Sequence, residues 1–380
     1  MKKYLPILLM TMLAFSSGTA AVLAFAGRAT NSTMPVREMA RRQMKDPKVI
    51  ALPFDLTYWG DYKLGMAALQ RPDVILVGPS RASQVRSDMF RPYSFYNMAL
   101  TAWNIDQTTE MLEEVFRRFR PRVAIVDMDY FMFSEPYVKS VKARDMWFNA
   151  PVRYELDILP QILKEWTSNP SYFDRAFSDR RRQDRPELER SLGFAALRGA
   201  NGFRKDGSYQ HGQATFDQSV EKLKINEGIL QAIPGAPKVS DVQLQKLSKL
   251  ADLAKKNGVI LIGIQFPMWQ ETVKVLDTDQ KYRQSSGVWR EFQSDEMQGR
   301  FEKLGIAFFD LSRDPVTTEY RNFIDAAHPS ERGMLVSLIS LSKNAKFLSI
   351  LPELDTRGLE NDLARADGSN DAFTIYGDAH

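Results

Sequence analysis

Five short, mainly apolar runs stand out along the chain, and each predicts a strand. The clearest is "DVILV" at residues 73–77, where no polar residue follows Asp73. Parallel strands covered by helices on both faces show this continuous pattern, whereas half-exposed strands alternate apolar and polar positions. We therefore predict strands over residues 73–77, 94–100, 122–131, 259–267 and 306–312.

Helical patterns separate these runs. Over residues 104–119 the apolar positions Met111, Leu112 and Val115 fall on one side of a helix. Similar patterns predict helices over residues 240–258, 288–303 and 331–348. Strands that alternate with helices imply crossover connections. The predicted fold is therefore α/β, a three-layer α/β/α arrangement with a mostly parallel central sheet.

The alternating units occupy two separate stretches, residues 72–133 and 238–350, which we take as two halves of one domain. Residues 134–237 hold many aromatic and charged residues and no convincing strand run, so we expect a mainly helical insertion that acts as a lid or as a substrate or partner surface. Residues 29–71 are polar and irregular, and we interpret them as an N-terminal linker that packs against the domain. Residues 351–380 are acidic and rich in Gly, Asp and Asn, which predicts a disordered tail.

Residues 1–28 have the features of an export signal, because Lys2 and Lys3 precede an uncharged segment over residues 4–27. This segment is long enough to cross a bilayer as an uncleaved anchor in the inner membrane, which is the interpretation we favour. The alternative is a signal peptide cleaved after Ala26, since residues 24–26 form a small-x-small pattern. Either way the rest of the chain is expected to face the periplasm or the cell exterior.

The charge and composition exclude several classes of function. The net charge is only +4 over 380 residues, and the basic runs at residues 117–122 and 179–185 are interleaved with acids or end a helix. Solvated faces explain such runs better than a nucleic-acid site. The chain has no cysteine and three scattered histidines, which argues against a zinc site. A Gly-rich phosphate loop is also missing from the sequence, so we expect neither a metal nor a cofactor.

Ser80 is the first candidate for chemistry, because it lies three residues beyond the end of "DVILV". Ligands of α/β sheets bind at the carboxyl ends of the strands. Gly78 permits a tight turn, and Pro79 restricts both its own backbone and that of Gly78. The backbone N–H of Ser80 is kept in this turn and is a candidate oxyanion donor.

A serine nucleophile needs a base, and the best candidate is His328 in "FIDAAHPSERG". Asp325 precedes His328 by three residues, so its carboxylate can reach Nδ1 and leave Nε2 facing Ser80. The alternative is that Asp325 and His328 only cap a helix or bond each other at the surface. His211 lies in a polar loop and is interpreted as an ordinary surface residue, and His380 ends the predicted tail.

The blocks "VGPSRAS", "YNMAL", "VDMDYF" and "DAAHPS" together resemble the SGNH (GDSL-like) hydrolase superfamily. The resemblance covers residues 73–131 and 259–341, and it is greatest to the membrane-anchored branch of alginate O-acetyltransferase-like and teichoic-acid D-alanylation-like proteins. It implies that Ser80 is the nucleophile, His328 its base and Asp325 the residue that orients the base.

The same resemblance implies an exported O-acetyltransferase or acetylesterase that acts on a cell-envelope or secreted polysaccharide. A membrane acyl-donor protein is a further partner that this branch implies. The alternative from another class is a catalytically inactive SGNH-like scaffold in a polysaccharide acylation or export complex.

Two blocks depart from the family pattern, and both departures concern the oxyanion hole. The glycine of the second block falls at about Ala102, whose backbone N–H is still a possible donor. The asparagine of the third block has no match, and Asp129 is the nearest residue. An ionised Asp would repel an oxyanion, so a second side-chain donor requires Asn97 or Asn104 as a substitute.

The role of several neighbouring residues stays open from sequence. Arg81 either adds positive charge near the site or pairs with Asp127 or Asp129. Four aromatic residues fall near predicted strand ends, where they either stack on sugar rings or belong to the core: Tyr96, Trp103, Tyr130 and Trp269.

Overall fold

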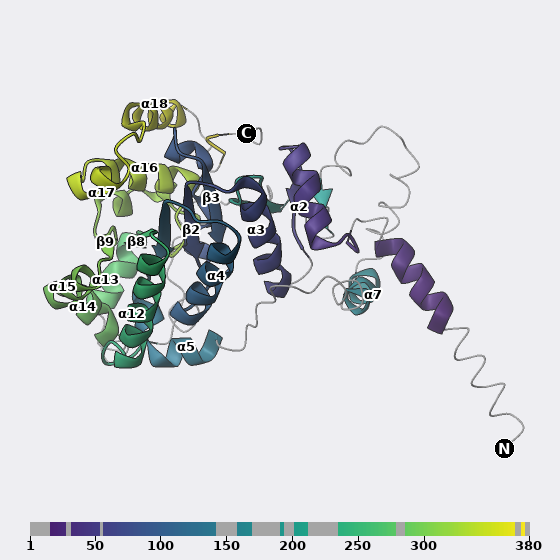
Figure 1. Ribbon diagram of the computed structural model, residues 1–380, viewed down its shortest axis with the longest axis horizontal. Helices are drawn as coiled ribbons and strands as arrows, with labels where there is room; N and C mark the ends of the chain where they lie inside the picture. Colours follow the sequence, from purple (N-terminus) through teal and green to yellow (C-terminus); the bar gives the residue numbers. More distant parts are fainter. Residues whose placement is uncertain are drawn as a thin grey trace, which may run out of the picture.

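A five-stranded parallel sheet is the centre of the molecule (Figure 1). The computed structural model describes residues 16–27, 32–53, 56–141, 158–168, 191–193, 201–211, 235–278, 286–368 and 374–376. The strand order is β3–β2–β4–β8–β9. The strands are β2 (Val74–Gly78), β3 (Phe95–Ala99), β4 (Val123–Asp127), β8 (Ile260–Gln265) and β9 (Ala307–Asp310). All five strands predicted from the apolar runs are present.

The two faces of this sheet are buried in two different cores, because successive side chains of a strand point to opposite faces. In β2, Ile75 and Val77 belong to one core, and Val74 and Leu76 belong to the other. The first core is completed by α3 (Leu56–Gln70), α4 (Ile105–Arg118) and α12 (Asp241–Lys256). The second is completed by α16 (Glu331–Ser342), α17 (Ala345–Ile350) and α18 (Thr356–Asp367). The predicted α/β class is confirmed, and the helices on both faces are compatible with a three-layer arrangement.

The predicted helices form, but two of them are divided by a capping residue. The segment 288–303 contains α14 (Gly287–Phe292) and α15 (Asp295–Lys303), and Ser294 caps the second helix. The segment 331–348 contains α16 and the start of α17, whose first N–H groups donate to the side chain of Asn344. A further helix, α13 (Gln270–Thr278), follows β8. Side chains that accept from helix N–H groups start new helices, and apolar spacing alone does not reveal such a break.

The N-terminal segment 29–71 is more regular than predicted. It contains α2 (Val36–Lys45), the two-residue strand β1 (Ile50–Ala51) and α3. α3 packs against α2, α4 and β3, and Tyr62 and Met66 are fully buried there. The expected packing segment is therefore a helical layer of the domain rather than an irregular linker.

The insertion 134–237 is not only helical in its described residues. It contains α5 (Glu135–Val141) and α7 (Leu159–Ser168), and also β5 (Ser191–Leu192), β6 (Gly202–Phe203) and β7 (Tyr209–Gln210). They form a second sheet of order β5–β1–β6–β7, in which β5 and β6 pair with β1, and β7 pairs with β6. Each has two residues, which is too short for a periodic pattern to reveal.

The prediction of a disordered C-terminal tail is wrong for residues 356–367, which form α18. Leu359 of this helix belongs to the second core, Ala366 is also buried, and Asp362 pairs with Arg91 at 2.6 Å. The prediction of disorder came from the acidic composition of the segment and did not take these apolar positions into account. His380 lies outside the described residues.

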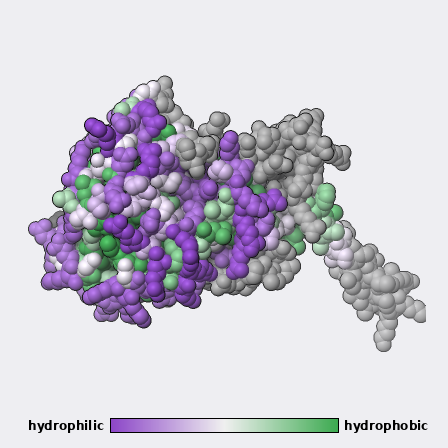
Figure 2. All heavy atoms as spheres, turned by 45° about the horizontal axis from the view of Figure 1, so that its top comes forward, coloured by the Kyte–Doolittle hydropathy of each residue, from purple (hydrophilic) through white to green (hydrophobic). Residues whose placement is uncertain are grey.

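The predicted export segment is described only in part. Residues 16–27 form a helix, and residues 1–15 lie outside the described residues. Within the described ranges, no helix combines the length and the apolar character needed to cross a membrane. On the face shown in Figure 2, hydrophilic side chains predominate, with hydrophobic ones between them.

Candidate active site

The three residues predicted to act together meet at the carboxyl end of β2. Ser80 Oγ lies 2.8 Å from His328 Nε2, although the two residues are 248 positions apart in the chain. His328 Nδ1 lies 2.9 Å from Asp325 Oδ2 and 3.0 Å from Oδ1. This is the arrangement of a nucleophile, a base and a carboxylate that orients the base.

The turn that presents Ser80 needs a glycine at its start. Gly78 ends β2 directly beside β4, and a Cβ atom on Gly78 would lie 2.5 Å from the Cβ of Asp127. Ser80 then begins the short 3₁₀ helix η1 (Ser80–Gln84). The side-chain amide of Asn97 on β3 donates to the carbonyls of Ala82 and Val85 at 2.9 and 2.8 Å. The neighbouring strands therefore hold the turn from both sides.

Gly78→Ala is expected to lower the free energy of unfolding by about 1–3 kcal/mol, because an added methyl group overpacks a site that cannot yield without backbone movement. Urea denaturation measures the change. Gly299→Ala is the control, since a Cβ on Gly299 in α15 meets nothing within 4 Å. Equal effects of the two substitutions would contradict this account of the turn.

The loop that carries the base is built around the Asp325 carboxylate. Asp325 Oδ1 accepts hydrogen bonds from the backbone N–H groups of Ala327 and His328, both at 2.8 Å. Burial by itself raises the pKa of Asp325, but the hydrogen bonds and charge of His328 and the two backbone donors outweigh it and bring the pKa to about 2. Ser330, not Asp325, caps α16 by accepting from Gly333 N–H. The helix-cap interpretation of Asp325 and His328 is therefore wrong.

Arg81 is a buried structural residue that joins three parts of the site. Its guanidinium pairs with Asp129, which decides between the two roles left open by the sequence. It also donates to the carbonyls of Pro267, at 2.9 Å, and Ala327, at 3.1 Å. Arg81 thus connects the nucleophile turn, the end of β8 and the base loop.

The predicted oxyanion donors are less well placed than the triad. The amide of Asn97 is fully buried and holds the turn, so the prediction that it faces an oxyanion is wrong. Ala102 N–H is directed at the Gly78 carbonyl, at 3.4 Å, and Asn104 caps α4. Ser80 N–H has no acceptor among the described residues and is the one predicted donor that remains available.

Asp127 has an unusual environment at the end of β4. Both of its carboxylate oxygens are buried and have no hydrogen-bond partner within the described ranges. Burial raises the pKa of Asp127 to about 7, although the charges of Arg81 and His328 act in the opposite direction. A buried carboxyl group therefore lies under the nucleophile turn and titrates near neutral pH.

The unfolding free energy of the wild-type chain should fall more steeply than that of Asp127→Asn as the pH rises from about 4 to about 7. The carboxyl ionises near pH 4 in the unfolded chain but only near pH 7 in the folded one, so over this range the unfolded state binds fewer protons and is favoured. Urea denaturation at several pH values measures the slopes. Asp252→Asn, at an exposed position of α12, is the control, and a slope that Asp127→Asn leaves unchanged would contradict the prediction.

His211 is less exposed than the polar surface loop predicted for it. It is half-buried beside Tyr209, with their ring centroids 4.9 Å apart. Burial lowers the pKa of His211 to about 4, and the charges of His328 and Arg204 add to this effect. Asp206-Gly207, in the turn between β6 and β7, is a typical hairpin signal that could have identified this segment.

The other sequence candidates are accounted for by the core. Tyr96, Trp103, Tyr130 and Trp269 are all buried, which favours the core interpretation over stacking on sugar rings. Within the described residues, no group of three His, Cys, Asp or Glu side chains is arranged to hold a metal ion.

Comparison with known proteins gives no further assignment, because no family model, no curated protein and no solved structure matches the chain. The geometry of Ser80, His328 and Asp325 is therefore the main basis for a functional proposal.

Proposed function

We propose that this chain is an exported SGNH-type serine acyl-processing enzyme, an O-acetyltransferase or acetylesterase that forms an acyl intermediate on Ser80. The observation that carries the proposal is the 2.8 Å contact between Ser80 Oγ and His328 Nε2, together with Asp325 on the opposite ring nitrogen. The blocks around these residues resemble the SGNH superfamily and support the same assignment.

In the proposed reaction, His328 Nε2 accepts the Ser80 proton as Oγ attacks the acyl carbonyl. The proton then passes to the departing alcohol oxygen, and the acyl group stays on Ser80. In the second half, His328 accepts a proton from an acceptor hydroxyl or from water, and that oxygen attacks the acyl carbonyl. The bond between the acyl carbon and Ser80 Oγ then breaks, and Oγ takes the proton back from His328. Asp325 keeps the proton of the neutral imidazole on Nδ1, so that Nε2 can accept.

The proposed substrate is a cell-envelope or secreted polysaccharide, which receives an acetyl group in the transferase reaction or loses one in the esterase reaction. The apolar segment at residues 4–27 supports a location outside the cytoplasm, with the chain tethered to the membrane. A membrane acyl-donor protein would then be the source of the acyl group.

A second candidate is a catalytically inactive scaffold of a polysaccharide acylation or export complex. It is favoured by the oxyanion hole, in which only Ser80 N–H remains of the predicted donors. The absence of one such donor typically costs about 100- to 1000-fold in rate, so an enzyme with this site is expected to be slow.

Mass spectrometry of the full chain after incubation with 4-nitrophenyl acetate tests the proposal. An acetyl group is expected on the peptide that contains Ser80, and His328→Ala should not carry it. If neither an adduct nor release of 4-nitrophenol is seen, the enzyme proposal is wrong and the scaffold is favoured.

A further inference from the structure

The end of the predicted export segment packs against α7 of the insertion. Residues 16–27 form a helix, here called the 16–27 helix, and its last residue contacts α7, since a Cβ on Gly27 would lie 2.8 Å from Ile162 Cδ1. Leu23 and Ala26 of the 16–27 helix are buried in the first core, as is Ile162 of α7. Both helices lie at the end of the molecule that is opposite β9 (Figure 1). α7 is therefore found where the export segment meets the folded domain.

The side chains that the protein covers indicate where a bilayer would end along the export segment. Leu23 is the first buried residue of the 16–27 helix, and Val22 before it is 49% exposed. Residues 4–22 are uncharged, and about 20 predominantly apolar residues suffice for a helix to cross a bilayer. In a tethered chain the bilayer surface therefore lies near Val22. Gly27 and its neighbour Ile162 lie about one to two helical turns beyond that level.

α7 has a wider apolar stripe than its packing against the protein uses. Leu159, Ile162, Leu163 and Trp166 recur at the helical spacing i, i+3, i+4 and i+7. Ile162 is 2% exposed, whereas the next residue, Leu163, is 44% exposed. A single exposed leucine is ordinary on a protein surface. This one belongs to a helical stripe and adjoins the residue that contacts the end of the export segment, so it lies close to the level of the bilayer surface.

α2 adds positive charge on the same side of the molecule (Figure 1). Arg41, Arg42 and Lys45 of α2 are exposed. The carboxylate of Glu38 lies 3.7 Å from the guanidinium of Arg41 and 3.8 Å from that of Arg42, so one acid is shared by two arginines. The exposed side of α2 therefore keeps a net positive charge. Basic side chains that follow a membrane segment favour contact with anionic lipid headgroups.

We propose that α7 lies on the surface of an anionic lipid bilayer, with Leu163 in the interface and the basic side of α2 at the headgroups. Interfacial helices bury their apolar side chains about 5–10 Å into the boundary between headgroups and acyl chains. Lys164, next to Leu163, is exposed and can extend its ammonium to the phosphates. The contact gives the insertion a lipid partner and fixes the orientation of the domain on the membrane. The inference rests on the proposed membrane tether and is independent of the chemistry at Ser80.

Nitroxide quenching in vesicles tests this contact. The chain has no cysteine, so a single introduced cysteine carries the only label. Full-chain Leu163→Cys with an NBD fluorophore is reconstituted into vesicles of phosphatidylcholine and phosphatidylglycerol that contain a lipid with a nitroxide near its headgroup. Its quenching should exceed that of Val242→Cys, a similarly exposed apolar position of α12, by at least about twofold. Ser168→Cys, about 140° around α7 from Leu163, should be quenched less than Leu163→Cys.

A label on Val22→Cys reports the tether separately, and the intact mass confirms that each chain keeps residues 1–26. Quenching at Val22 without quenching at Leu163 would overturn the α7 contact and leave the tether standing. Absence of quenching at both positions would overturn both. A blue shift at Leu163 without quenching would mean that a second copy of the chain covers α7, which also overturns the lipid contact.

Two changes test the contribution of α2 to the same contact. Vesicles without phosphatidylglycerol, and the double variant Arg41→Glu with Arg42→Glu, should each weaken the quenching at Leu163. Unchanged quenching in both cases would reject the role of α2. Acetylation of Ser80 by 4-nitrophenyl acetate is measured apart from these labels, so its failure would reject the enzyme and leave the membrane contact in place.

Discussion

Ser80→Ala should lower kcat/KM for 4-nitrophenyl acetate by at least about 1000-fold, because loss of a nucleophile removes the covalent route entirely. What remains after such a loss in other serine enzymes comes from the oxyanion hole and from binding. Here only Ser80 N–H is available among the predicted donors, so little residual rate is expected. The rate of 4-nitrophenol release measures the effect.

Ser83→Ala is a matched control for this substitution. Ser83 lies in the same η1 helix and is 6% exposed, but its hydroxyl contacts the side chain of Gln84 rather than His328. It should retain activity within a few-fold, and both variants should melt near the wild-type temperature. A Ser80→Ala chain that kept a tenth or more of the wild-type rate would refute the role given to Ser80.

The sheet and the triad could be predicted because their signals lie in short stretches of sequence. The strands of the parallel sheet are largely buried on both faces, so their sequences are mostly apolar, although Asn97 interrupts the run of β3. The Gly-Pro-Ser turn and the Asp-x-x-His segment each contain the residues that make their contacts. Only the contact between Ser80 and His328 depends on the fold. It forms because the carboxyl ends of parallel strands lie at the same edge of the sheet.

The oxyanion donors could not be predicted in the same way. Asn97 has the residue type and position expected of a donor, yet its amide satisfies the carbonyls of Ala82 and Val85. A buried carbonyl that lacks a donor destabilises the folded state, so the Asn97 amide bonds these two carbonyls instead of a ligand. Whether the amide meets the carbonyls or a ligand depends on the folded turn, and the spacing of residues does not reveal it.

Long-range ion pairs explain most of the remaining differences. Arg86, Asp206 and Glu331 lie far apart in the sequence, and each alone resembles an ordinary surface charge. Their pairing brings part of the insertion to the site and allows charged residues to be buried. The strands β6 and β7 have only two residues each, so their own strand propensity does not explain them. They form because β6 pairs with β1 and because the ion pairs of Asp206 hold the turn between them.

Asp206→Ala is expected to lower the free energy of unfolding by about 3–5 kcal/mol, the usual result of removing one partner from a buried ion pair. The substitution removes one of the two carboxylate partners of Arg86, which is 1% exposed. It also removes the acceptor of Ser87 N–H and of Ser208 N–H. Urea denaturation gives the magnitude, and a loss below about 1 kcal/mol would contradict the buried network.

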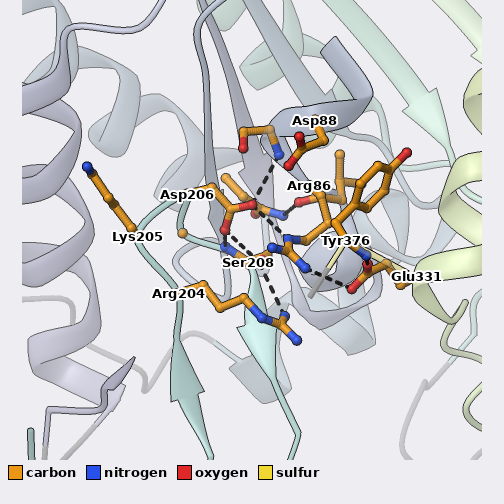
Figure 3. A network of polar contacts seen from close by, with 12 residues as sticks. Arg86, Asp88, Arg204, Lys205, Asp206, Ser208, Glu331 and Tyr376 are labelled. Atoms are coloured by element: carbon orange, nitrogen blue, oxygen red, sulfur yellow. Dashed lines mark hydrogen bonds and ion pairs between the residues drawn. The ribbon is translucent and has the colours of Figure 1, made fainter. Parts of the chain in front are cut away.

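The pH dependence of the same variant separates the ionic contribution from simple packing. Burial alone would raise the pKa of Asp206, but Arg86, Ser208 and Arg204 hold it well below the usual range. A carboxylate with a depressed folded-state pKa stabilises the protein above about pH 4, and this stabilisation is lost as the pH falls further. The difference between wild type and Asp206→Ala should therefore shrink below pH 4. Lys205→Ala is the control, because this neighbouring side chain points away from the network (Figure 3). A difference that stayed constant down to pH 2 would mean that lost packing, not lost charge, destabilises the variant.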